Sequence, residues 1–286
     1  MRWSRLFGCF ACTPLLAVFL PLSTMAQVQV PKLENLEKNI GLCSGGAQTT
    51  PEAQLAACTA VIESGAETKQ SLAIAHNNRG NAYNKQGQYD RAMEDYNASI
   101  AAKPDYAKAF NNRGVAYQKK AEYDKAIADF DESIRITPTY AGAFANRAET
   151  YRKKGDYRTA VRDYDEAIRL QPTLIGVLNG RCWSRAILGE LQAALADCNQ
   201  ALRQEPDTAA IFDSRGLTYL KLGQWSAAIA DYSSALRLQP KSASALYGRG
   251  YGRLKSGNVA EGRADMAAGT ALDAAIAAEF ARYGLQ

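Results

Sequence analysis

Small and aromatic residues return at fixed places every 34 residues along most of this 286-residue chain. The repeat is easiest to see in NNRGNAY at 77–83 and NNRGVAY at 111–117. Aligned on this period, the chain divides into six units at 73–106, 107–140, 141–174, 175–208, 209–242 and 243–274. A period of this length predicts a repeat architecture in which each unit is one supersecondary structure.

Two kinds of position define each unit. The eighth and twentieth positions are mostly small, and they read Gly80, Gly114, Ala148, Cys182, Gly216 and Gly250, then Ala92, Ala126, Ala160, Ala194, Ala228 and Gly262. The eleventh and twenty-fourth are mostly aromatic, and they read Tyr83, Tyr117, Tyr151, Arg185, Tyr219 and Arg253, then Tyr96, Phe130, Tyr164, Cys198, Tyr232 and Met266. Small residues let two helix backbones approach, and aromatic residues fill the space beside them. The pattern therefore predicts two antiparallel helices in each unit.

Glycine and proline mark the breaks between these helices. A glycine near the fifteenth position, where a helix C-terminus favours it, occurs at Gly87, Gly155, Gly189, Gly223 and Gly257. Proline cannot continue a helix, and it stands near the end of the first five units at Pro104, Pro138, Pro172, Pro206 and Pro240. One helix pair cannot bury its apolar face alone, so we expect twelve helices stacked as an all-α solenoid.

This pattern resembles the tetratricopeptide (TPR) repeat family over residues 73–274, which implies a right-handed superhelix. The fourth-position tryptophan typical of the family is replaced by His76, Phe110, Phe144, Leu178, Phe212 and Leu246. The seventh-position leucine is arginine in every unit, and units four and six depart most from the pattern. Residues 39–72 are expected to form a degenerate helix pair, and residues 275–286 a C-terminal capping helix.

The first 26 residues have the pattern of a secretory signal peptide. Arg2 and Arg5 precede an apolar run that ends in small residues at Ala26, where we expect cleavage, and 27–38 is expected to be a linker. The alternative is a retained membrane anchor, which the short length of the run and its prolines disfavour. Without the two arginines the formal charge falls from +5 to +3, too little to indicate nucleic-acid binding.

Four cysteines remain after the signal peptide, and they suggest two disulfides in an oxidising compartment, most readily a bacterial periplasm. Cys182 and Cys198 lie on the two facing helices of unit four, and Cys43 and Cys58 have nearly the same spacing in the degenerate pair. We therefore predict the bridges Cys43–Cys58 and Cys182–Cys198. Four reduced thiols, or a free Cys43, are the alternatives.

Each seventh-position arginine has an aspartate sixteen residues later. The six pairs are Arg79 and Asp95, Arg113 and Asp129, Arg147 and Asp163, Arg181 and Asp197, Arg215 and Asp231, and Arg249 and Asp265. In a hairpin that turns near the fifteenth position these side chains face each other, and a guanidinium group binds a carboxylate with two hydrogen bonds. We favour structural ion pairs over a row of cations for an anionic ligand.

The resemblance also implies a concave groove lined by the first helix of each unit. Carried over position by position, it gives the candidate groove residues Asn77, Asn78, Asn81, Lys85, Lys108, Asn111, Asn112, Lys119, Asn146, Arg152, Lys153, Trp183, Tyr247 and Tyr251. Asn78, Asn112 and Asn146 recur in register, so their amides are expected either to bind an extended peptide backbone or to be solvated. The basic half of the family's two-carboxylate clamp is absent from this chain.

No set of residues in the sequence has the pattern of a catalytic site, and we expect neither enzyme activity nor a bound cofactor or metal. The pattern predicts an exported adaptor that binds a protein or peptide segment in its groove. The alternative is a self-associating structural subunit of an envelope assembly.

Overall fold

The computed structural model describes residues 35–65, 68–174 and 176–285, and these ranges contain helices and no strand. Residues 35–44 are helical, followed by α2 (Pro51–Glu63). Units one to three contain α3 (Lys69–Lys85), α4 (Tyr89–Ala102), α5 (Ala107–Lys119), α6 (Tyr123–Ile136), α7 (Ala141–Lys154) and α8 (Tyr157–Leu170). Units four to six contain α9 (Val177–Leu188), α10 (Leu191–Gln204), α11 (Ala209–Lys221), α12 (Trp225–Leu238), α13 (Ala243–Lys255) and α14 (Val259–Leu272), and α15 (Ile276–Arg282) ends the chain. The predicted signal peptide at 1–26 and most of the predicted linker at 27–38 lie outside the described residues.

The small eighth position is required by the aromatic ring of the second helix. A Cβ atom on Gly80 would lie 2.7 Å from the Tyr96 ring, and one on Gly114 would lie 2.7 Å from the Phe130 ring. Tyr232 contacts two units at once, since Cβ atoms on Gly216 and Gly248 would lie 3.0 and 2.3 Å from it. The twenty-fourth-position aromatic residue therefore packs its own helix pair and, in unit five, the next pair as well.

Most of the first helices end at a glycine in the left-handed conformation. Gly155 and Gly189 occupy this position directly after α7 and α9, with φ of 84° and 85°. Unit two has alanine there, and Ala121 is the one non-glycine residue of the described chain with positive φ, at 59°. This backbone region is unfavourable for residues with a Cβ atom, so the turn of unit two is strained.

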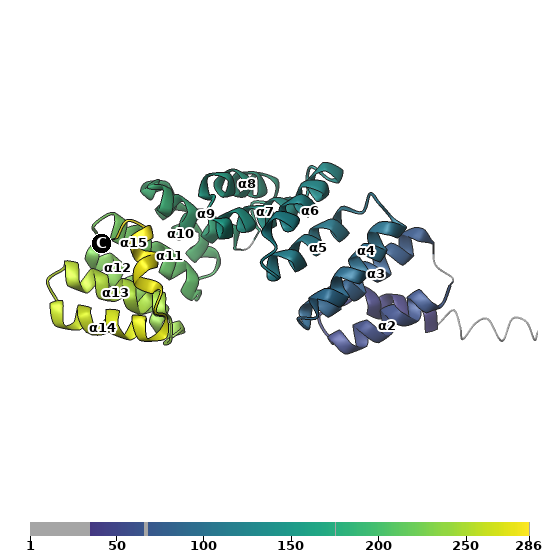
Figure 1. Cartoon of the computed structure of the whole chain (residues 1–286), viewed down its shortest axis with the longest axis horizontal. Helices are drawn as coiled ribbons and strands as arrows, with labels where there is room; N and C mark the ends of the chain where they lie inside the picture. The colour runs from purple at the N-terminus through teal and green to yellow at the C-terminus, as the bar shows by residue number, and fades with distance from the viewer. Residues whose placement is uncertain (1–34, 66–67, 175, 286) are drawn as a thin grey trace, which may run out of the picture.

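The helix pairs follow one another along an arch, with α2 and α14 near opposite ends (Figure 1). The first helices of successive units contact each other from α3 to α13, whereas in the described chain no second helix contacts the second helix of the next unit. The first helices therefore form the inner row of the arch, where neighbours are closest. The side chains of the first helices that point away from the second helices line the concave face.

The C-terminal helix does not simply cover the end of the stack. Phe280 of α15 packs on Tyr247 of α13, and Tyr283 packs on Trp183 of α9, two units back along the chain. α15 contacts α13 and α14, and Figure 1 shows it among the helices of units five and six. The capping helix expected from the sequence is thus folded back over the concave face of units four to six.

None of the described helices combines the length and the apolar character that crossing a membrane requires.

Candidate functional site on the concave face

All six seventh-position arginines bind the aspartate sixteen residues later. In unit three, Arg147 Nε and Nη2 donate to the two carboxylate oxygens of Asp163 at 2.7 and 2.8 Å. The other five pairs have the same two-bond arrangement at 2.5 to 2.9 Å. The aspartates are buried, and the arginines keep only 14% to 21% of their side-chain surface exposed. These guanidinium groups belong to the scaffold, and the row of cations for a ligand is not formed.

The same arginines also hold consecutive units together, a role that the sequence analysis did not predict. Arg113 Nη1 donates to Asn97 of unit one at 2.6 Å, and Arg147 Nη1 donates to Asp131 of unit two at 2.6 Å. Arg181 and Arg215 make the equivalent bonds to Asp165 and Asn199 at 2.7 Å. The signal was present in the sequence, because an oxygen-bearing residue also precedes each of these four arginines by sixteen positions.

Units four and six replace the eleventh-position aromatic residue with arginine, and this arginine joins the ion pair. Arg185 Nη1 donates to Asp197 at 2.8 Å, and Arg253 Nη1 donates to Asp265 at 2.7 Å. The apolar packing lost at these positions is therefore replaced in part by a second charged hydrogen bond to a carboxylate that is already buried.

His76, the single histidine of the sequence, completes the equivalent cluster in unit one. Its Nδ1 lies 2.9 Å from Asp95 Oδ1. Burial opposes ionisation of Asp95, but the hydrogen bonds from His76 and Arg79 outweigh it and hold the pKa of this carboxyl below its usual value. His76 therefore adds a hydrogen bond at a position that other units use for apolar packing. The described residues contain no group of His, Cys, Asp and Glu arranged to hold a metal ion.

Five asparagines from α3, α5 and α7 form one hydrogen-bonded chain, the amide chain. Asn77 Nδ2 donates to Asn78 at 3.3 Å, and Asn112 Nδ2 donates to Asn77 at 2.9 Å. Asn111 Nδ2 then donates to Asn112 at 3.1 Å, and Asn146 Nδ2 donates to Asn111 at 2.9 Å. Each amide has further donor and acceptor capacity beyond these bonds.

The amide chain corrects two of the candidate groove residues. Asn77 and Asn111 are 3% and 5% exposed, because the fifth position lies in the contact between successive first helices. They cannot touch a ligand directly, and they orient Asn112 and Asn146, which remain half-buried at the surface. Asn81 accepts a hydrogen bond from Tyr96 at 2.9 Å, so part of its acceptor capacity is already used.

The thirteenth-position lysines divide into two groups. Lys85, Lys119 and Lys153 are exposed, as is Lys108. Lys221 instead donates to the Ile187 carbonyl at the end of α9, at 3.1 Å, and burial lowers the pKa of its amine. These four exposed lysines lie on units one to three, so this half of the concave face carries positive charge. Lys255 of unit six is exposed as well, and its amine lies over the Tyr251 ring at 5.2 Å from the centroid.

The three predicted groove aromatics are all covered by other parts of the chain. Tyr251 is only 7% exposed and packs on Trp225 with ring centroids 6.5 Å apart, so its assignment to the groove is wrong. Tyr247 and Trp183 do face the groove, but Phe280 and Tyr283 of the C-terminal segment lie on them at 4.9 and 5.4 Å. Tyr251, at the ninth position of unit six, is buried because Trp225 at the start of α12 packs against it.

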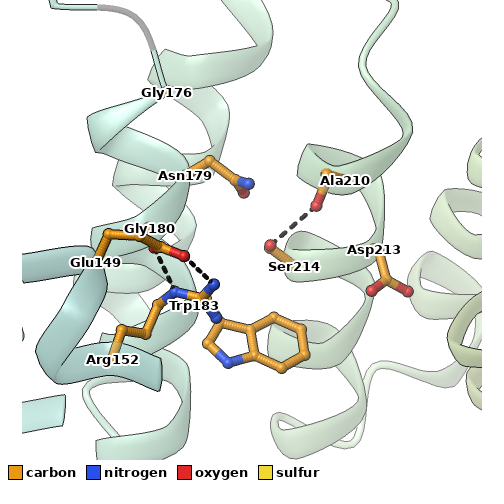
Figure 2. A pocket seen from close by; sticks show the side chains of 9 residues that line it. All are labelled: Glu149, Arg152, Gly176, Asn179, Gly180, Trp183, Ala210, Asp213 and Ser214. Carbon is orange, nitrogen blue, oxygen red and sulfur yellow. Dashed lines mark hydrogen bonds and ion pairs between the residues drawn. The ribbon is translucent and has the colours of Figure 1, made fainter. Parts of the chain in front are cut away.

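A cavity of about 340 Å³ opens on the concave face between α7, α9 and α11, next to the covered aromatics (Figure 2). Trp183 lies at one end of the cavity, and Arg152 is held beside it by two hydrogen bonds of 2.7 Å to Glu149. Asn179 points into the space between α9 and α11. Asn179 was not among the residues selected from the sequence, although it occupies the same fifth position as Asn77 and Asn111.

Two disulfides link cysteines 15 and 16 residues apart. Cys43 is bonded to Cys58, and Cys182 to Cys198, with Cα atoms 4.6 and 5.5 Å apart. Both pairs are buried, and Cys182–Cys198 joins α9 to α10 within unit four.

Family models recognise the repeats. One described as TPR repeat matches residues 80–121 and 216–257, and one described as Tetratricopeptide repeat matches 107–140 and 141–174. The second pair of ranges coincides with units two and three of the 34-residue alignment. The chain therefore carries tetratricopeptide repeats in these ranges.

Solved structures show the same fold. A tetratricopeptide repeat protein from Parabacteroides merdae ATCC 43184 is 16% identical, with a TM-score of 0.62 over 88% of this chain and 99% of that one. YrrB, described as a TPR protein with an unusual peptide-binding site, is 22% identical, with a TM-score of 0.55 over 67% of this chain and 97% of its own. PilW, described as a widely conserved type IV pilus biogenesis factor, is 18% identical, with a TM-score of 0.63 over 70% and 92%. Comparison with curated protein sequences finds no match.

Proposed function

We propose that this chain is an exported, non-enzymatic scaffold that binds an extended protein segment along the concave face of units one to three. The observation that carries the proposal is the amide chain. Asn112 and Asn146 each donate to a buried asparagine, and their half-buried amides on successive first helices keep further N–H and acceptor capacity. Oriented amides of this kind suit the alternating donors and acceptors of an extended peptide backbone, and pre-orientation lowers the entropic cost of binding.

Two further features support this half of the groove. The C-terminal segment packs on aromatic residues of units four and six, and no ring contact of this segment with units one or two occurs in the described part of the chain. The exposed Lys85, Lys108, Lys119 and Lys153 favour a segment with acidic residues or a free carboxyl terminus. The two disulfides and the N-terminal sequence pattern support export to an oxidising compartment such as a periplasm.

Site-specific photo-crosslinking in the native compartment tests the proposal. A crosslinker at Lys119, the last residue of the first helix α5, is expected to capture a discrete partner. The matched control at Arg135, exposed on the outer helix α6, is expected to capture none. Capture from Arg135 but not from Lys119 would assign binding to the convex face and contradict the proposal.

A second candidate is a self-associating subunit, and one observation favours it. Since α15 folds toward the concave face, α14 at the end of the stack keeps Val259 and Leu272 exposed at 44% and 50%. Light scattering on the purified chain separates the two, because a Val259→Glu, Leu272→Glu variant would dissociate an end-to-end assembly and leave a groove-binding monomer unchanged.

A further inference from the structure

The amide chain follows a rule that is interrupted at unit four. In units one and two, the fifth-position asparagine accepts a hydrogen bond from the sixth-position asparagine of the next unit. Between units three and four both positions lack an amide, since they are Ala145 and Gly180. Between units four and five the fifth position is again asparagine, but the sixth position is Ser214.

This leaves the side-chain oxygen of Asn179 without a hydrogen-bond partner. Ser214 donates to its own helix at the Ala210 carbonyl, 2.9 Å away, instead of reaching Asn179. Asn179 Oδ1 is buried and is one of three buried side-chain N and O atoms in the described chain that have no hydrogen-bond partner. The neighbour that Asn77 Nδ2 uses on its own helix is also missing, because the equivalent position is Gly180. A buried acceptor without a partner is unfavourable, so a group that supplies a donor here gains a hydrogen bond that the chain itself does not provide.

The missing side chains leave room for such a group. The cavity of about 340 Å³ is far larger than the roughly 10–15 Å³ that one water requires. A side chain at position 180 would not fit in place of the missing amide, because a Cβ atom on Gly180 would lie 2.4 Å from the Tyr164 hydroxyl. Trp183 supplies an apolar surface at the end of the cavity (Figure 2).

The charges around the cavity favour a neutral occupant. Arg152 and Glu149 neutralise each other through two hydrogen bonds, and Tyr164 donates a further bond to Glu149 at 2.9 Å. Asp213 also lines the cavity, and its carboxylate accepts from Ser244 at 2.8 Å. With two carboxylates and one guanidinium group on the lining, an anion would be repelled, and a cation would meet carboxylates that already have partners.

We propose that this cavity binds the side-chain carboxamide of a glutamine or asparagine in the bound segment, paired with Asn179. The amide N–H donates to Asn179 Oδ1, and the amide oxygen accepts from Asn179 Nδ2. The chain itself provides the precedent for the first of these bonds, because an asparagine carboxamide donates to the fifth-position asparagine between units one and two and between units two and three. The inference deepens the proposed peptide-binding function and rests on it.

Small probes test the site without the natural partner. N-acetyl-glutamine methylamide, N-acetyl-glutamate methylamide and N-acetyl-norvaline methylamide share one backbone and differ in the side chain. Titrated into the full mature chain, only the glutamine probe is expected to shift the Trp183 indole N–H resonance saturably at millimolar concentration. Trp225, which packs on Tyr251 outside the cavity, is the internal control.

Two variants sharpen the test. Asn179→Ala is expected to weaken the glutamine probe at least tenfold with no loss of melting temperature, because it removes an acceptor that has no partner. Ser214→Asn is expected to abolish probe binding and leave the melting temperature equal or higher, since the new amide would restore the internal bridge. Equal binding of the norvaline probe, no shift with any probe, or unchanged binding to either variant would overturn the inference. None of these outcomes depends on capture of a partner at Lys119, so the proposed function is tested separately.

Discussion

The arginine at the seventh position shows how a single residue type can serve the whole solenoid. Its Nε and Nη2 bind an aspartate within the unit, and in units two to five Nη1 binds the preceding unit. A planar guanidinium group with five donors can do this, whereas a lysine cannot. The residue therefore fixes both the helix pair and its stacking on the neighbour.

Ala121 departs from the repeat pattern, and this departure predicts a stabilising substitution. Ala121 has φ of 59° where other units have glycine. Ala121→Gly is expected to raise the free energy of unfolding by about 0.5–1 kcal/mol, because relief of the left-handed strain exceeds the added entropy of the unfolded chain. Urea denaturation followed by circular dichroism measures the change.

The matched control is the reverse substitution in the next unit. Gly155→Ala places a Cβ atom at φ of 84° and is expected to lower the free energy of unfolding by about 1 kcal/mol. A loss of stability in both variants would show that the turn of unit two is not strained.

At the scale of elements, α15 is held by few but large side chains. Ile276, Phe280 and Leu285 are buried at 3%, 2% and 8% exposure, although the helix itself spans only seven residues. A helix of this length is not stable alone in water, so its structure depends on this packing. Its position on the concave face follows from aromatic contacts and not from helix propensity.

Phe280→Ala is therefore expected to release the C-terminal segment and to leave the rest of the stack folded. Amide hydrogen exchange should lose protection over residues 276–285, while α3 to α8 keep theirs, because repeat units interact mainly with their neighbours. Arg282→Ala, which removes an exposed side chain of the same helix, is the control and should change nothing. Global loss of protection after Phe280→Ala would show that the segment is part of the cooperative core.

At the scale of the whole molecule, stability is the sum of unit stabilities and contacts between neighbouring units. The two disulfides lie in helix pairs that depart from the repeat pattern, the pair before unit one and unit four. In unit four the bridge stands where units one, two, three and five place a glycine or alanine against an aromatic ring.

Cys182→Ala with Cys198→Ala is expected to lower the free energy of unfolding of the central units by about 3 kcal/mol. The reason is that the bridge restrains the loop between two cysteines 16 residues apart in the unfolded chain. Urea denaturation with hydrogen exchange over α9 and α10 measures it. Cys43→Ala with Cys58→Ala is the comparison, and it should increase fraying at the N-terminal end only. Equal protection of α9 and α10 with and without their bridge would contradict the prediction.

The sequence by itself determined the repeat, the helix pairs and the partners within each pair. The 34-residue period, the small and aromatic positions and the sixteen-residue spacing are local, and contacts inside a hairpin follow from local spacing. Arg147 with Asp163 and Cys182 with Cys198 are contacts of this kind.

Tertiary structure alone decided what joins different units and what covers the groove. The burial of Asn77 and Asn111 depends on how closely successive first helices approach, and that distance is set by packing across the whole stack. Tyr283 meets Trp183 one hundred residues earlier in the chain, at a separation that no periodicity encodes. The same holds for the cavity at Asn179, because it exists only where three helices from three units converge.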